Sequence, residues 1–209
     1  MSGNSKRAGR TNRRSDILRA TEKLIRSRGL ACVTTRQISQ QVGCSEGALY
    51  VHFKGRLELL LAVLEESLPG MLRPLEGLKE SLGRGTPHEN LARALDGIFK
   101  FHRRVVPVTA GLFAEPELLA AYRNSLNRQG KGPHLSMRVI EEYIRSEQEL
   151  GRIDSPVDAK LAAGLIMSSS FFRAFVEQFF GKPMQPGWKE FAKQVIATVA
   201  PEPSEERES

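Results

Sequence analysis

The sequence predicts an all-α protein, with an N-terminal three-helix helix-turn-helix domain joined by a fourth helix to a C-terminal helical domain. Three observations support this prediction. Almost every segment between residues 13 and 200 has apolar residues at helical spacing, and none shows the convincing alternation of a strand. Two short segments with helix-capping residues are joined by a turn that contains Gly43. At 209 residues, the chain is long enough for a small domain and a larger one.

The positive charge of the chain is concentrated at its start. Residues 1–56 hold 12 Lys and Arg against 3 Asp and Glu, whereas the other 153 residues hold 19 against 21. The net charge of +7 therefore arises in the first quarter of the chain. The charge continues into helix-forming sequence, which favours a nucleic-acid partner over a basic tail that only improves solubility.

The two ends and the apolar runs indicate where the protein is expected to act. The opening MSGNSKRAGRTNRRS is polar and basic, so we expect no signal peptide and a disordered tail over residues 1–12, with a second tail over 201–209. The longest uncharged run, Leu161 to Phe172, has 12 residues, whereas a membrane span needs about 20. Cys32 and Cys44 form no disulfide framework and suit a reducing compartment. We therefore expect a cytoplasmic location and no membrane partner.

An enzyme is the first alternative to a nucleic-acid-binding protein. The four histidines show no metal-ligand spacing, and the chain has no nucleophile elbow, phosphate-binding glycine loop or zinc-protease motif. Glu141 and Glu142 are adjacent on an expected helix, so they point in different directions and form no catalytic pair. We expect no enzymatic activity, no cofactor and no metal site.

The first helix is expected from about Ser15 to Arg28, with Ser15 as its cap and Gly29 at its end. Arg13 and Arg14 precede it, at a helix terminus where the dipole disfavours cations, so we interpret them as an arm that reaches a phosphate or a minor groove. The buried stripe of this helix is expected to comprise Ile17, Leu18, Thr21, Leu24 and Ile25.

The second and third helices have clear local signals. Thr34 and Gln37 form a capping box at the start of the second helix. The chain then turns through Gly43, and Ser45 caps the third helix. A leucine-rich fourth helix is expected over residues 56–68.

In a helix-turn-helix the second helix of the motif enters the major groove with its N-terminus, which here carries Glu46, Gly47 and Ala48. The two small residues allow a close approach, and Ala48 could contact a thymine methyl group. Glu46 could accept a hydrogen bond from cytosine N4, or it could equally be a first-turn carboxylate that stabilises the helix dipole.

Hydrogen-bond donors are spread over the end of the third helix and the link that follows it. Tyr50, His52 and Lys54 can each reach a phosphate oxygen, and Thr35 and Arg36 at the start of the second helix can do the same. Each residue alone has a structural alternative, such as a packed tyrosine or a solvated lysine. Their joint position in the basic quarter of the chain favours DNA.

The segment TTRQISQQVGCSEGALYVHFKGRLELLLAVLE resembles the N-terminal DNA-binding domain of the TetR family of bacterial transcriptional repressors, over residues 15 to about 65. The pattern LY-x-HF followed by Lys54 and a leucine-rich helix is the family hallmark. The stretch Gly55-Arg56-Leu57 departs from the polar cap, lysine and acidic residue common in the family, which indicates a looser start of the fourth helix. The resemblance implies DNA contacts by the residues Thr35, Arg36, Ser45, Glu46, Gly47, Tyr50, His52 and Lys54.

The sequence divides into a helix-turn-helix domain over 13–55 and a helical regulatory and dimerisation domain over 56–200. The helix that starts at Ser155-Pro156 has a proline at its first position and a continuous apolar stripe. Beyond a break at Pro69-Gly70, helices are expected at 71–82, 89–105, 107–128 with an interruption at Pro116, 134–150, 156–180 and 187–200.

The last two helices could close the core of a monomer, but the resemblance implies a four-helix interface between two subunits. We favour a homodimer, because a twofold axis would present two recognition helices about 34–36 Å apart on a pseudo-palindromic operator. The residues expected in the interface are Leu161, Leu165, Phe172, Val176, Trp188, Phe191 and Val195.

The resemblance also implies a pocket among the middle helices for an inducer that releases a repressor from DNA. An apolar lining would suit a small hydrophobic or aromatic inducer, oriented by Arg173, Tyr122 or His134. Two alternatives remain open, namely a DNA-binding regulator without a small-molecule ligand and an activator. The expected lining residues, each of which could also be ordinary core, are Phe99, Phe101, Phe113, Met137, Met167, Phe171 and Phe172.

Overall fold

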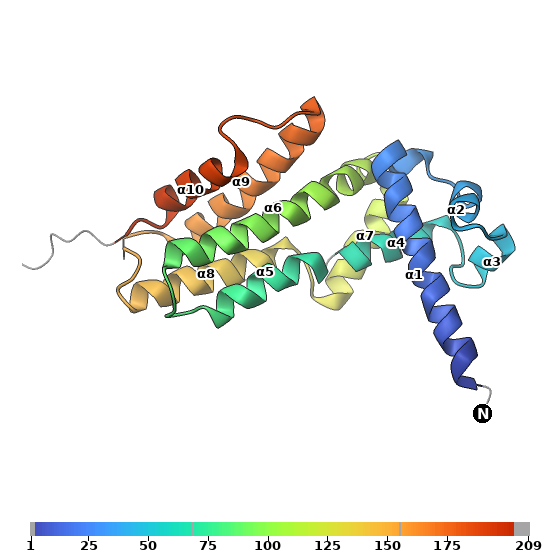
Figure 1. Ribbon diagram of the computed structural model, residues 1–209, viewed down its shortest axis with the longest axis horizontal. Helices are drawn as coiled ribbons and strands as arrows, with labels where there is room; N and C mark the ends of the chain where they lie inside the picture. The colour runs from blue at the N-terminus through green and yellow to red at the C-terminus, as the bar shows by residue number, and fades with distance from the viewer. Residues whose placement is uncertain (1–2, 68, 155, 203–209) are drawn as a thin grey trace, which may run out of the picture. The chain divides into compact units, whose positions relative to one another are not determined.

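The computed structural model describes residues 3–67, 69–154 and 156–202, with side chains for 13–66, 73–154 and 156–202, and it confirms the all-α fold class (Figure 1). No strand occurs within these ranges. The helices are α1 (Gly3–Arg28), the 3-10 helix η1 (Leu30–Cys32), α2 (Thr35–Val42), α3 (Glu46–Tyr50), α4 (Arg56–Ser67), α5 (Pro69–Glu80), α6 (Pro87–Leu112), α7 (Pro116–Gln129), α8 (Pro133–Glu149), α9 (Ala159–Phe180) and α10 (Trp188–Val199).

The chain folds into two compact units. The first unit comprises residues 1–68 and 107–128, and the second comprises 69–106 and 129–209. The expected helix-turn-helix domain lies within the first unit, which also includes α4, the end of α6 and most of α7. Leu118 of α7 is buried in the same apolar core as α1 and α4, which explains why this unit extends beyond residue 55.

Helix α1 begins at Gly3 rather than at Ser15, so Ser15 lies inside the helix and residues 3–12 of the expected tail are helical. The segment contains no proline, so nothing in it forces the helix to stop at Ser15. Gly29 ends the helix as expected, with φ 81°. Most of the second expected tail, residues 203–209, lies outside the described residues. The expected buried stripe is confirmed for Ile17, Leu18, Thr21, Leu24 and Ile25.

Helix α6 continues through Pro107, although the sequence predicts that one helix ends and another begins there. Proline has no N–H to donate to the carbonyl four residues earlier, which here belongs to Arg103. The side-chain amide of Gln178 donates to that oxygen at 2.6 Å. An acceptor that the proline would leave unpaired is therefore satisfied by a residue 75 positions away, and the break comes at Pro116 instead.

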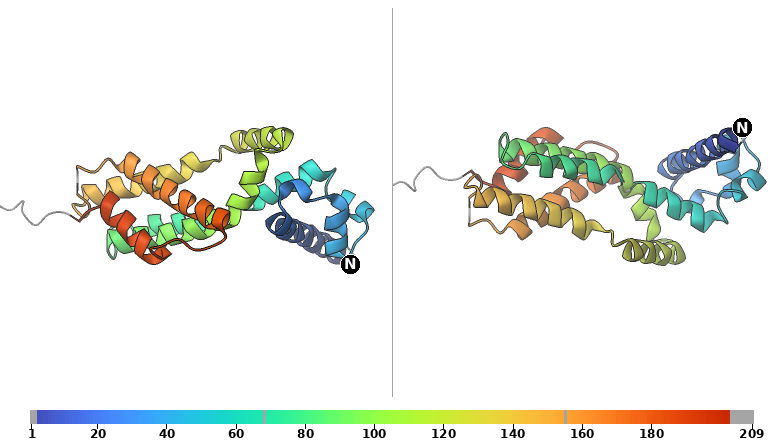
Figure 2. Two further views of the ribbon diagram at one scale, coloured as in Figure 1. Left: turned by 90° about the horizontal axis from the view of Figure 1, so that it is seen from above. Right: turned by 90° about the horizontal axis from the view of Figure 1, so that it is seen from below.

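The second unit is a bundle in which α8 lies alongside both α5 and α9, while α10 packs on α9 (Figures 1 and 2). Apolar residues spaced three and four positions apart on each helix face a shared core, which gives each helix its stabilising burial. The centre of this core is formed by Leu95, Ile98, Ile140, Ile144, Ala163, Ile166 and Ile196.

Helix α9 starts at Ala159, three residues later than the proline at position 156 suggested. The carboxylate of Asp158 accepts hydrogen bonds from the N–H groups of Lys160 at 2.9 Å and Leu161 at 3.0 Å. An aspartate that satisfies two free N–H groups is a stronger start signal than a proline at the first position. The helix is therefore 22 residues long.

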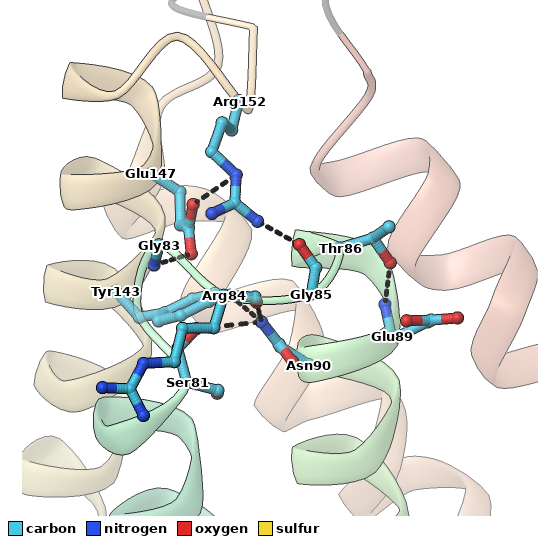
Figure 3. A network of polar contacts seen from close by, with 10 residues as sticks. All are labelled: Ser81, Gly83, Arg84, Gly85, Thr86, Glu89, Asn90, Tyr143, Glu147 and Arg152. Atoms are coloured by element: carbon cyan, nitrogen blue, oxygen red, sulfur yellow. Dashed lines mark hydrogen bonds and ion pairs between the residues drawn. The ribbon is translucent and has the colours of Figure 1, made fainter.

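A polar network ties the loop between α5 and α6 to helix α8 (Figure 3). The Nδ2 group of the buried Asn90 donates to the Arg84 carbonyl at 2.7 Å and to the Tyr143 hydroxyl at 2.8 Å. Glu147 is fully buried, accepts from the Gly83 N–H at 3.1 Å, and pairs with Arg152 at 3.3 Å. Burial raises the pKa of the Tyr143 phenol, so this hydroxyl stays neutral.

Helix α9 is, within the described residues, the one helix whose length and composition would allow it to cross a membrane. In the structure, 44% of its most apolar window is buried inside the protein. Its inward side, which includes Ala163 and Ile166, forms part of the core of the second unit. A core helix of a bundle meets the same criteria of length and composition.

Candidate nucleic-acid interface

Helix α2 starts with the capping box that the sequence predicts. The Thr34 hydroxyl accepts from the N–H of Gln37 at 3.3 Å, and the Gln37 side chain accepts from the N–H of Thr34 at 3.1 Å. Val33 and Ile38, on either side of this cap, are completely buried. The start of α2 is therefore anchored both by hydrogen bonds and by apolar contact.

The turn after α2 and the cap of α3 are also as expected. Gly43 has φ 71° and ψ 43°, a left-handed conformation that costs little only for a residue without Cβ. The Ser45 hydroxyl then accepts from the N–H of Ala48 at 3.2 Å and caps α3. Leu49 and Phe53 are buried beneath α3, so the residues between them are directed outward. Two short capped helices with a glycine turn thus form the helix-turn-helix.

Helices α2 and α3 are joined by a side-chain hydrogen bond at the expected DNA-facing end. The Thr35 hydroxyl donates to Oε2 of Glu46 at 3.0 Å. This bond occupies one carboxylate oxygen and leaves Oε1 without a protein donor among the described residues. Glu46 is thereby held in one orientation, with one oxygen available as an acceptor.

The three donors at the end of α3 lie at the surface. Tyr50 is 50% exposed, Lys54 is exposed and His52 is half-buried. No described residue forms a hydrogen bond or ion pair with these three side chains. Their donors are consequently available for phosphate oxygens.

The other residues expected to contact DNA differ in whether their side chains already bond to other groups of the protein. Arg13 and Arg14 lie inside α1 rather than on an arm before it, because the helix begins at Gly3. Arg36 and Arg13 are exposed and have no protein partner within the described part of the chain. Arg14 instead pairs with Glu66 at 3.3 Å, and its guanidinium lies 5.1 Å from the centre of the Phe53 ring. Arg14 therefore needs to leave an intramolecular pair before it can reach DNA. The remaining expected contacts, Ser45 and Gly47, are exposed, and Ala48 is half-buried.

The start of α4 is held more firmly than the sequence suggested. Glu58, in the first turn, accepts from the N–H of Lys54 at 2.8 Å. Arg56 forms a bidentate pair with Glu115, with both N–O distances 2.6 Å. Glu115 lies 59 positions away, so local sequence patterns gave no signal for this pair. The looser start expected from Gly55-Arg56-Leu57 is therefore not found.

The structure brings together only some of the residues expected to line an inducer pocket: Phe101 and Met167 lie in one apolar core, and Met137 packs against it. Phe113 belongs to the first unit and is 76% exposed, while the other six belong to the second unit. Of those six, Phe99, Phe101 and Met167 are buried in the core, whereas Phe171 and Phe172 are exposed on α9 and Met137 is half-buried.

The three expected orienting groups have different surroundings. Arg173 is 2% exposed, pairs with Glu177 at 2.7 Å and donates to the carbonyls of Met184 and Pro186. Tyr122 packs in the first unit and His134 is exposed.

A buried polar pair that the sequence did not reveal lies between α6 and α9. Nδ1 of His102 is 2.9 Å from the hydroxyl of Ser170, and both residues are buried. Burial lowers the pKa of His102 to about 4, so its imidazole is neutral near pH 7. Spacing could not reveal this pair, because its members are 68 residues apart.

The residues expected in the dimer interface are mostly exposed on α9 but are packed against the protein itself on α10. On α9, Leu161, Leu165 and Phe172 are 60%, 45% and 60% exposed, and Val176 is half-buried. On α10, Trp188 stacks on Phe99 at 3.6 Å and donates to Asp96 at 3.1 Å. Phe191 lies under the Arg173 guanidinium, and Val195 packs against the core. Helix α9 therefore offers the larger unpaired apolar surface.

Comparison with known proteins agrees with this geometry. Residues 17–63 match the family described as bacterial regulatory proteins, tetR family. The nucleoid occlusion factor SlmA of Vibrio campbellii is 37% identical over 178 residues, which cover 76% of this chain and 86% of that protein. The HTH-type transcriptional regulator YerO of Bacillus subtilis is 29% identical over 87 residues, and the chain spans 30% of its length.

Solved structures share the fold at low sequence identity. A TetR-family transcriptional regulator from Mesorhizobium loti superposes with a TM-score of 0.71 and 13% identity, over 90% of this chain and 95% of its own. SmeT of Stenotrophomonas maltophilia in complex with triclosan gives 0.64 and 19%, over 90% and 92%. FadR of Bacillus subtilis with stearoyl-CoA gives 0.65 and 18%, over 90% and 97%. The chain belongs to the TetR family, and it is a DNA-binding transcriptional regulator rather than an enzyme.

Proposed function

We propose that the protein is a homodimeric repressor that binds a pseudo-palindromic operator and is released from it by a small hydrophobic or aromatic inducer. The observation that carries the DNA-binding part is the set of unpaired donors around the capped helix-turn-helix. Arg36, Tyr50 and Lys54 are exposed and lack partners among the described residues, and they lie together around the start and end of the motif. These donors fix the register on the phosphates, while the start of α3 faces the bases.

Sequence preference comes from Glu46 in this proposal. Its Oε2 is held by Thr35 and its Oε1 remains an acceptor, which suits the N4 amino group of cytosine in the major groove. A carboxylate near phosphates is repelled unless it finds a donor, so Glu46 disfavours duplexes without a cytosine at this position. Gly47 and Ala48 beside it leave room for the backbone to approach.

The homodimer is supported by the outward side of α9. Leu161, Leu165 and Phe172, which follow one another at helical spacing, are all exposed, and Phe179 continues the same line at 73% exposure. A second copy of the chain would cover this stripe in a twofold arrangement in which each α9 contacts the other. Between Lys160 and Arg173 the helix has no charged residue.

Release by an inducer is supported by relatives of the same fold rather than by an open cavity. SmeT has been solved with triclosan, a hydrophobic aromatic molecule, and FadR of Bacillus subtilis with stearoyl-CoA, which joins a long apolar acyl chain to a charged coenzyme A. In the second unit, Phe99, Phe101 and Met167 are packed in the core, so an inducer would have to displace side chains as it binds. An inducer that prefers the rearranged state lowers operator affinity by the same factor by which DNA lowers inducer affinity.

A second candidate is favoured by the SlmA relatives, which are nucleoid occlusion factors. In this version the protein binds DNA sites without a small-molecule ligand. Both candidates act in the cytoplasm, which suits the free thiols of Cys32 and Cys44.

The DNA-binding part is tested by fluorescence anisotropy with duplexes selected from a random pool and with the DNA that flanks the gene. We expect a pseudo-palindromic site whose affinity falls steeply as salt rises. Tyr50→Phe and Lys54→Ala should each weaken binding by about 1–2 kcal/mol. Lys54→Ala should also reduce the salt slope, which is the steepness with which the logarithm of affinity falls with the logarithm of salt concentration, by about one. Lys79→Ala, an exposed lysine on α5, is the matched control. Wild-type affinity in both variants would refute the assigned interface.

The two candidates are separated by titrating the DNA complex with triclosan and with stearoyl-CoA. Loss of anisotropy, together with a change in fluorescence of the single tryptophan, Trp188, supports an inducible repressor. A DNA complex that neither compound affects, even at saturating concentration, favours the candidate without a ligand.

A further inference from the structure

Arg56 occupies a place where a cation is not expected. It is the first residue of α4, and the positive end of a helix dipole disfavours a guanidinium there. The side chain is nevertheless held by four hydrogen bonds. Nε donates to the Val33 carbonyl at 2.8 Å and Nη2 to the Leu30 carbonyl at 3.0 Å, while Nη1 and Nη2 each donate to a carboxylate oxygen of Glu115 at 2.6 Å.

These bonds join three segments of the first unit. Leu30 is the first residue of η1, the short connection between α1 and α2, and Val33 directly follows η1. Val33 immediately precedes Thr34, the cap of α2. Glu115 lies between the end of α6 and the start of α7. One guanidinium therefore connects the segment that leads into the helix-turn-helix with α4 and with the α6–α7 junction.

A tight backbone contact lies beside this pair. A Cβ added to Gly111, near the end of α6, would be 2.5 Å from the Cβ of Leu30, closer than real Cβ atoms approach one another. The glycine lets α6 pack directly on η1. Because Leu30 is fixed at its side chain by this contact and at its carbonyl by Arg56, η1 cannot shift without disturbing both.

The electrostatic environment favours the charged form of both partners. The hydrogen bond from Arg56 holds the pKa of the Glu115 carboxyl below its ordinary value, and the same bond raises the pKa of Arg56. Both side chains are only partly accessible, at 34% and 20%. A bidentate pair of this kind is geometrically specific as well as attractive.

We propose that Arg56 and Glu115 are positioning residues for DNA binding: together they fix η1, and through it α2 and α3, in the orientation that fits the major groove. Neither residue touches DNA in this proposal. Arg56 acts on the carbonyls that precede α2, and Glu115 holds the guanidinium in place. The proposal rests on the DNA-binding function but not on the existence of an inducer.

Two simpler roles make different predictions. If Arg56 were a phosphate contact, its removal would weaken specific and non-specific binding alike and reduce the salt slope by about one. If the pair only stabilised the fold, its loss would lower the unfolding midpoint without changing the affinity of the folded protein. A positioning role instead lowers affinity for the operator relative to random DNA, with an unchanged salt slope.

The most informative variant is Glu115→Gln in the full-length chain. It removes a negative charge, which by long-range electrostatics alone should strengthen DNA binding slightly. We expect it to weaken operator binding roughly tenfold instead, because the amide can accept only one hydrogen bond from Arg56. Glu117→Gln is the matched control, since it removes the same charge from an exposed residue two positions away. It should bind DNA at least as tightly as wild type.

Two further variants complete the test. Arg56→Ala should weaken operator binding by at least roughly tenfold without a change in salt slope, and Arg56→Lys should recover only part of it, because an ammonium cannot bridge two carbonyls and a carboxylate in the same geometry. Each affinity is measured by anisotropy at a temperature at which circular dichroism shows the variant to be folded.

The outcomes separate this proposal from the DNA-binding function. Suppose that the wild-type protein binds the operator. The positioning role is then overturned if Glu115→Gln binds as tightly as wild type, or if Arg56→Ala lowers the salt slope by about one. Either result leaves the proposed DNA interface intact. If the wild-type protein binds none of the selected duplexes, both the positioning role and the DNA-binding function are overturned.

Discussion

The proposed DNA-facing surface of the first unit and the α5–α6 loop of the second unit are built from similar polar residues but use them in opposite ways. On the DNA-facing surface, Arg36, Tyr50 and Lys54 are exposed and have no partner within the described residues. Around the loop, Asn90 and Glu147 are buried and each bonds to two or more groups (Figure 3).

This difference follows from the cost of burying polar groups. A polar side chain inside a protein is tolerated only when its hydrogen bonds are satisfied, so the loop network is organised to hold the fold. A group intended for an external ligand must stay unpaired at the surface, where water satisfies it until the ligand arrives. Loss of a loop residue should therefore lower stability, whereas loss of a DNA-facing residue should lower affinity.

The largest expected effect is that of Glu147→Ala. It leaves Arg152 and the Gly83 N–H without their buried acceptor, so we expect the free energy of unfolding of the second unit to fall by about 4 kcal/mol. Urea unfolding followed by the fluorescence of Trp188, which lies in this unit, measures the change.

Glu149→Ala, two residues later and exposed, is the control and should change stability by less than about 0.5 kcal/mol. DNA affinity of the folded protein should be the same in both variants. A Glu147 variant as stable as wild type would mean that the loop network contributes little to the fold.

The second prediction concerns the buried histidine of the same unit. The pKa of His102 is about 4 in the folded state, below its ordinary value of 6.5, so the folded protein binds fewer protons than the unfolded chain between these values. The stability that the neutral imidazole contributes is complete above pH 6.5 and is lost as pH falls toward 4, by about 3 kcal/mol in total.

The measurement is the free energy of unfolding at pH 7 and at pH 4.5 for wild type and His102→Gln. The variant should lose this pH dependence, whereas His134→Gln, at an exposed position, should keep it. Equal pH dependence in wild type and His102→Gln would assign the acid sensitivity to other groups.

The sequence predicted features that depend on neighbours close along the chain. The Thr34–Gln37 box and the Ser45 cap are formed between residues three apart, and Gly43 follows from a local backbone requirement. The core stripe of α1 likewise depends only on helical periodicity. These signals are sufficient to identify the fold and to predict which surface faces DNA.

Features that depend on distant partners could not be predicted in the same way. Helix α6 passes through Pro107 because Gln178 satisfies the Arg103 carbonyl, and the start of α4 is fixed because Glu115 reaches Arg56. From its sequence neighbours alone, Pro107 suggests a break in the helix, and Arg56 suggests a weakly held helix start. The expected pocket had the same weakness, since apolar residues such as Phe99 do not reveal from sequence whether they line a cavity or fill a core.

A third prediction tests whether the second unit depends on close packing as well as on polar contacts. A Cβ at Gly97 would lie 2.3 Å from Cγ of Pro74, a ring atom that cannot move aside, so Gly97→Ala should lower stability by about 2 kcal/mol. A Cβ at Gly77, also helical and in the same unit, would meet nothing within 4 Å.

Gly77→Ala should therefore stabilise the protein slightly, by up to about 1 kcal/mol, because alanine has the higher helix propensity. Urea unfolding of the two variants measures the contrast. If both variants changed stability in the same direction, packing between α5 and α6 would be less tight than the structure shows.

The smallest expected effect lies on the proposed DNA-facing surface and concerns the hydrogen bond between Thr35 and Glu46. Thr35→Val removes the hydroxyl that orients Glu46 but keeps the β-branched shape, so stability should barely change. We expect operator affinity to fall by about 1 kcal/mol, with a weaker preference for cytosine at the base pair nearest Glu46. Thr35→Ser, which retains the hydroxyl, should preserve both affinity and preference in competition anisotropy with single-base operator variants. If serine and valine behave alike, the hydroxyl orients nothing, and Glu46 is better explained as a carboxylate that stabilises the start of α3.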